Sequence, residues 1–110
     1  MKDSFIKLLE KATEGKYRTT HHSSRYQTGV TIHKQIFDKV EDYTVTTEFT
    51  LFKNRLEGET PSLHVAANGY GSETFDLTEA ELIKVQFYMD QIIEIDRKRG
   101  IATLTAFLTC

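Results

Sequence analysis

The segment from Thr78 to Gly100 constrains the fold most, because it predicts a long amphipathic helix with a signal at each end. Thr78 and Glu81 have the spacing of a capping box, in which each side chain accepts a hydrogen bond from a backbone N–H of the first turn. The basic run at 97–99 suits the negative end of a helix dipole, and a glycine often stops a helix. We therefore expect a helix over about residues 79–99.

The apolar residues of this segment divide into two unequal sets. At 100° per residue, the larger set falls within one arc roughly 160° wide, and its members are Leu82, Val85, Tyr88, Met89, Ile92, Ile93 and Ile95. Ile83 and Phe87 lie on the opposite side of the helix. Three interpretations are open for these two residues. They are covered within the same domain, by residues 4–14 or by the C-terminal tail; they are simply exposed; or they anchor an interface such as a symmetric homodimer.

The rest of the chain changes from helical to strand periodicity and back. A short helix is expected over residues 4–14, where Phe5, Leu8, Leu9 and Ala12 recur at helical spacing. From Tyr17 to Leu77 apolar and polar residues alternate, as in "YTVTTEFTLF" at 43–52, which is typical of strands with one buried face.

Turn-forming sequences at 38–42, 53–61 and 68–72 join these strands by short connections. The pattern predicts a single α+β domain over residues 1–110. It has an antiparallel β-meander of four to six strands packed on the long C-terminal helix, with a short N-terminal helix. For the tail, residues 101–110, a final strand is our preferred prediction and a short helix the alternative.

Composition excludes some classes of protein and favours others. The chain has 14 basic and 16 acidic residues, so it lacks the overall basic excess that is usual for nucleic-acid binders. No apolar run reaches the 18 to 20 residues of a membrane helix, and the first residues lack the apolar core of a signal peptide. The lone cysteine, Cys110, cannot form an internal disulfide. We expect a cytoplasmic protein with no membrane contact.

The segment "YRTTHHSSRYQT" contains the side chains best suited to recognition. If it is extended, its residues alternate between two faces, neither of which can be fully buried. It is therefore an exposed edge strand, a mobile loop or a binding surface for phosphate, acidic proteins or stacked bases. The candidate binding residues are Arg18, His21, His22, Arg25 and Tyr26.

Catalytic and metal-binding patterns are missing from the sequence. There is no HExxH motif and no pair of CxxC motifs, and the adjacent His21 and His22 would point to opposite faces of a strand. His33 and His64 alternate with apolar positions, which predicts that both lie on the uncovered face of the sheet. We therefore predict no catalytic residue, no metal ligand and no cofactor.

These observations favour a small non-enzymatic protein-interaction module that acts by occupying a partner's surface. It would be an inhibitor or adaptor, of the kind found among phage proteins that block host defence, and it would form a homodimer through Ile83 and Phe87. Nucleic-acid or nucleotide binding through residues 17–26 is the alternative. A metal-dependent or ligand-dependent enzyme is the third hypothesis.

Overall fold

The described residues form one five-stranded sheet and two helices. The computed structural model describes residues 1–37, 42–53, 58–69 and 71–109, with side chains except those of Phe37, Asp42 and 102–109. In chain order the elements are α1 (Lys2–Ala12), β1 (Arg18–Ser23), β2 (Gln27–Phe37), β3 (Asp42–Phe52), β4 (Ser62–Ala67), β5 (Gly71–Asp76) and α2 (Glu79–Thr109). Short connections join the strands, so each pairs with the next one along the chain.

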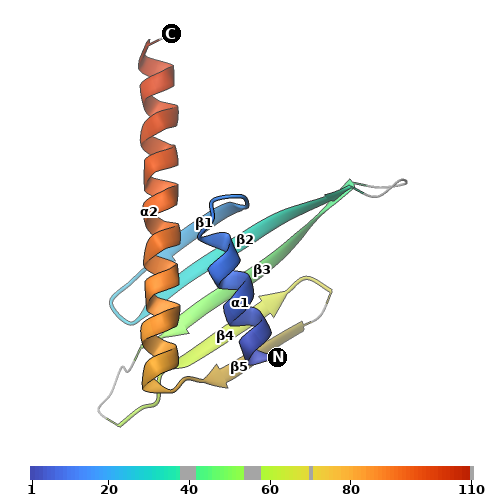
Figure 1. The fold of residues 1–110 in the computed structure, drawn as a ribbon, viewed down its shortest axis with the longest axis vertical. Helices are drawn as coiled ribbons and strands as arrows, with labels where there is room; N and C mark the ends of the chain where they lie inside the picture. Colours follow the sequence, from blue (N-terminus) through green and yellow to red (C-terminus); the bar gives the residue numbers. More distant parts are fainter. Residues whose placement is uncertain (38–41, 54–57, 70, 110) are drawn as a thin grey trace.

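The sheet is an antiparallel meander in the order β1-β2-β3-β4-β5, with β1 and β5 at its edges (Figure 1). The long pair β2–β3 is aligned from Gln27 opposite Phe52 to Phe37 opposite Asp42. The shorter β1 adds to β2 with His22 opposite Gly29. The predicted α+β class, with a meander, a short N-terminal helix and a long C-terminal helix, is confirmed.

Both helices cover the same face of the sheet (Figure 1). Alternate residues of the three inner strands meet the apolar faces of the helices there. The buried apolar core consists of Ile6, Leu9, Ala12, Val30, Ile32, Phe49, Leu51, Leu63, Val65, Leu77, Val85, Met89 and Ile92. The opposite face of the sheet carries mostly threonine, histidine and charged residues, and neither helix covers it. We call it the open face.

The start of α2 is fixed by the predicted capping box. The Glu81 backbone N–H donates to Thr78 Oγ1 at 3.2 Å, and the Thr78 N–H donates to Glu81 Oε1 at 3.0 Å. Lys2 Nζ of α1 also lies 2.9 Å from Glu81 Oε1. The hydrogen bond from the Thr78 backbone and the one from Lys2 lower the pKa of Glu81. The capping box therefore also ties the two helices together.

The end of α2 differs from the prediction. The expected strand over residues 101–110 is wrong, because α2 continues through Gly100 to Thr109. Gly100 is not among the described glycines with positive φ, and a glycine within a helix costs only about 1 kcal/mol relative to alanine. The following residues include two alanines and two leucines, which are strong helix formers. Cys110 lies outside the described residues.

Past Arg99, α2 runs beyond the sheet for roughly three further turns (Figure 1). At the other end of the chain, α1 begins and ends two residues before the predicted bounds of 4–14. Within the described residues, no helix has a stretch that is both long and apolar enough to cross a membrane.

Candidate functional site

Ile83 and Phe87 lie on the side of α2 that faces away from the sheet. Their exposed fractions are 65% and 58%, although both are large and apolar. α1 packs against another side of α2, where Glu10 contacts Tyr88 and Lys2 contacts Glu81. The interpretation in which α1 or the tail covers Ile83 and Phe87 is therefore wrong.

An apolar groove of about 640 Å³ runs beside these two residues. Its walls come from α2 and from the residues that flank the β3–β4 connection. Leu82, Ile83, Gln86, Phe87 and Asp90 form one wall, and Lys53 and Pro61 form the other. We call it the outer groove. Carbon atoms make up most of its surface, and one charged side chain of each sign lies in it, which is the composition typical of a binding cleft.

The five predicted binding residues do not form one cluster. Residues 18–23 are edge strand β1, so this part of the segment is a strand and not a loop. Strand alternation puts Arg18 and His22 on the open face and His21 on the face that α2 covers. Arg25 and Tyr26 lie in the β1–β2 connection, with the guanidinium carbon 5.4 Å from the ring centre.

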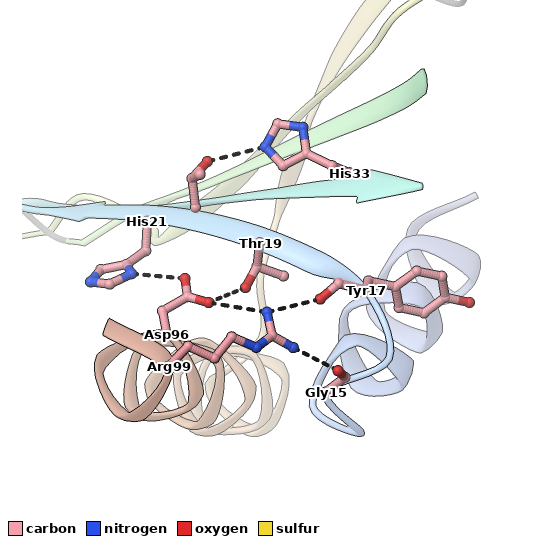
Figure 2. Close-up of polar contacts among 8 residues, drawn as sticks. Gly15, Tyr17, Thr19, His21, His33, Asp96 and Arg99 are labelled. Atoms are coloured by element: carbon pink, nitrogen blue, oxygen red, sulfur yellow. Dashed lines mark hydrogen bonds and ion pairs between the residues drawn. The ribbon is translucent and has the colours of Figure 1, made fainter. Parts of the chain in front are cut away.

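His21 takes part in a polar cluster with α2, shown in Figure 2. Its Nδ1 lies 2.9 Å from Oδ2 of Asp96, whose side chain is only 10% exposed. The hydroxyl of Thr19 donates to Oδ1 of Asp96, and Arg99 Nη1 lies 3.7 Å from the same oxygen. We call Thr19, His21, Asp96 and Arg99 the Asp96 cluster. Both carboxylate oxygens are therefore engaged.

Arg99 extends this cluster to the connection between α1 and β1 (Figure 2). Its Nη2 donates to the Gly15 carbonyl at 2.6 Å, and its Nη1 donates to the Tyr17 carbonyl at 3.1 Å. Carbonyls that precede an edge strand have no partner in the sheet, so a guanidinium fork is well suited to bind them. The Asp96 cluster therefore fastens the edge strand and its entry to the long helix.

Asp96 and Arg99 were not among the predicted site residues. A signal for them exists in the sequence. At 100° per residue, both project in the direction of Val85, Met89 and Ile92, so they are charged residues within the apolar arc of α2. A charge on the core side of a helix needs a partner. The identity of that partner depends on which strand packs against this part of the helix, and the sequence pattern does not predict that strand.

The chemistry of the Asp96 cluster is that of a structural link. An aspartate bound to histidine Nδ1 holds the imidazole in one orientation, as in catalytic triads. However, among the described residues the other groups bound to Asp96 are a threonine and an arginine, with no serine or cysteine nucleophile. Among the described residues there is also no group of three or more His, Cys, Asp or Glu that could hold a metal ion.

The remaining histidines lie on the open face, as predicted for His33 and His64. His33 Nε2 is 3.3 Å from the hydroxyl oxygen of Thr20, and His64 Nδ1 is 2.7 Å from that of Thr74. Each of these contacts joins neighbouring strands. The open face is therefore a polar surface crossed by side-chain hydrogen bonds.

Comparison of the chain with protein-family models, with curated proteins and with solved structures finds no match.

Proposed function

We propose that the protein is a small protein-interaction module without catalytic activity, and that the outer groove is its binding surface. One observation carries the proposal: Ile83 and Phe87 are both more than half exposed and lie side by side along an apolar groove. Burying a side chain of this size is worth about 1.5–3 kcal/mol. Two such anchors at the centre of a contact would form a binding hot spot.

The shape of the site favours a helical ligand. The groove follows α2, and an amphipathic helix binds such a groove with apolar anchors spaced three and four residues apart. A module of this kind acts by covering a surface, as an inhibitor or an adaptor does, and it needs no chemical step. Lys53 and Asp90, in opposite walls of the groove, would help to orient the ligand.

Binding of nucleic acid is the second candidate function. Arg18 and His22 share the open face, and the guanidinium of Arg25 lies over the ring of Tyr26. Against it, His21 is turned toward Asp96, and Glu48 and Asp76 lie on the open face as well. Such binding would weaken steeply as salt is raised, because phosphate contacts release counterions.

A photo-cross-linker at position 87 tests the proposed function. Phe87 is replaced by benzoylphenylalanine in the full chain. The cells that produce this variant are irradiated, and covalent adducts of the protein are identified by mass spectrometry. We expect one defined polypeptide adduct that disappears when Ile83→Asp is added. The matched control carries the cross-linker at Lys11, an exposed residue of α1 outside the groove. No adduct at position 87, or equal adducts at both positions, would rule out the outer groove as a binding surface.

A further inference from the structure

We propose that the outer groove is occupied by α2 of a second copy of this chain, running antiparallel to the first. This inference rests on the proposed function, and it names the polypeptide that the groove binds. It follows from the order of residues along the outer side of α2 and from the length of that helix.

One row of residues runs along the side of α2 opposite the core. Steps of four and three residues connect its described members, which are Ile83, Phe87, Asp90, Glu94, Arg97 and Ile101. This spacing keeps a row on one side of a helix and is that of the seam between paired helices. The sequence continues the same steps with Leu104 and Leu108. We call this set the outer row.

The outer row has apolar residues at both ends and charges in the middle. Glu94 and Arg97 have side chains that are 46% and 68% exposed, and they form an ion pair at 3.0 Å within one helix. Ile101, beyond them, is 59% exposed. From the N-terminal to the C-terminal end of α2, the outer row is therefore apolar, then acidic, then basic, then apolar again.

The charges at the centre of the outer row are complementary when two copies of the row meet in opposite directions. If two outer rows meet antiparallel about an axis between residues 94 and 97, Glu94 of each copy faces Arg97 of the other. In the same register Phe87 falls opposite position 104, Ile83 opposite position 108 and Asp90 opposite Ile101, and the sequence has leucine at both 104 and 108. A parallel pair would instead bring Glu94 against Glu94 and Arg97 against Arg97, which is repulsive. Charge complementarity therefore selects the antiparallel arrangement, with the two-fold symmetry usual for homodimers.

The length of α2 makes the arrangement reciprocal. Past Arg99 the helix extends beyond the sheet, as Figure 1 shows. In an antiparallel pair, this extension of one copy lies along the outer groove of the other. α1 does not obstruct it, because α1 packs on the side of α2 that carries Glu81 and Tyr88. Each copy thus supplies both a groove and the helix that fills it.

A charge-swap cycle tests the register. The mass of the full chain is measured by native mass spectrometry and sedimentation over a range of concentrations, with reductant present so that Cys110 cannot link two copies. We expect a wild-type dimer. Glu94→Arg alone and Arg97→Glu alone should each raise the dimer dissociation constant about tenfold, because two attractive pairs become repulsive. The double variant E94R/R97E should restore the wild-type value.

Lys11→Glu is the matched control, since it makes the same change of charge as Arg97→Glu on an exposed residue of α1. It should leave the dissociation constant unchanged. Ile83→Asp combined with Phe87→Asp should abolish the dimer. If that variant fails to fold by circular dichroism, the charge-swap cycle still decides, because its two positions are exposed.

The other outcomes separate this inference from the proposed function. A protein that stays monomeric up to about 100 μM, well above the dissociation constants of specific complexes, overturns the second copy as the occupant. If its position-87 cross-linker then captures a different polypeptide, the proposed function stands. If the cross-linker captures nothing, both fail. A dimer whose single charge variants associate as tightly as the wild type overturns the antiparallel register.

Discussion

The imidazole Nδ1 of His21 lies 2.9 Å from Oδ2 of Asp96, which joins the edge strand β1 to α2 across 75 positions of sequence. This contact changes the role of a histidine that the sequence marks as a binding residue. His21 is turned toward the helix and holds it, whereas its neighbour His22 lies on the open face over Gly29. The two adjacent histidines therefore have different structural roles.

Removing the Asp96 carboxylate should destabilise the fold. Asp96→Ala leaves Thr19, His21 and Arg99 without their common acceptor, so the free energy of unfolding should fall by about 1.5–3 kcal/mol. Urea denaturation at a fixed protein concentration measures the loss. Glu14→Ala is the control, because its ion pair with Lys16 is exposed and should contribute well under 1 kcal/mol. Equal losses in the two variants would contradict a structural role for the Asp96 cluster.

Replacing Gly100 by alanine should stabilise the protein. Gly100 lies inside α2, and an added Cβ would meet nothing within 4 Å, so helix propensity should raise the free energy of unfolding by about 1 kcal/mol. Gly15→Ala should have the opposite effect. Its φ is +76°, a conformation that costs an L-residue about 1–2 kcal/mol. Thermal unfolding of both variants tests the pair, and a loss of stability in Gly100→Ala would argue against a continuous helix.

Glu81 should make stability depend on pH in the acid range. The hydrogen bond from the Thr78 backbone and the contact with Lys2 lower the pKa of Glu81 in the folded state. Its contribution is therefore present above the unfolded pKa and is lost as the pH falls through the lowered folded pKa. Relative to Glu81→Gln, the wild type should be more stable at neutral pH, and the difference should vanish well below about pH 4.

Urea midpoints measured at several pH values test the Glu81 prediction. Glu79→Gln, in the same first turn of α2, controls for the effect of any carboxylate near a helix N-terminus. A Glu81→Gln difference that stays constant down to pH 2 would show that the contribution does not come from ionisation.

Gly29 and His22 should be energetically coupled. A Cβ on Gly29 would overlap the His22 ring, so Gly29→Ala must displace that ring. In a His22→Ala background the same change should stabilise the strand by about 0.5–1 kcal/mol, because glycine is unfavourable within a strand. In the wild-type background the gain should be smaller or reversed. A double-mutant cycle measures the difference, and equal effects in both backgrounds would exclude the contact.

Local signals in the sequence were sufficient for the fold class and for most of the elements. The capping box of Thr78 and Glu81 marks the start of α2, and the period of two over residues 43–52 predicts a strand of the meander. Both signals act between residues that are close along the chain. Local signals were not sufficient at Gly100, where the helix was predicted to end. The preference of glycine for helix ends is small, and the continuation of a long helix outweighs it.

The candidate sites depended on the tertiary structure. Strand alternation alone separated His21 from His22, but which of the two meets a partner depends on the face that α2 covers. Ile83 and Phe87 stand opposite the apolar arc by helical periodicity, yet their exposure depends on where α1 packs. The sequence by itself therefore determined most of the helices and strands, except the tail after Gly100, and the side of each on which a residue falls. The packing of α1 and α2 on the sheet decided the Asp96 cluster and the outer groove, because both depend on contacts between residues far apart along the chain.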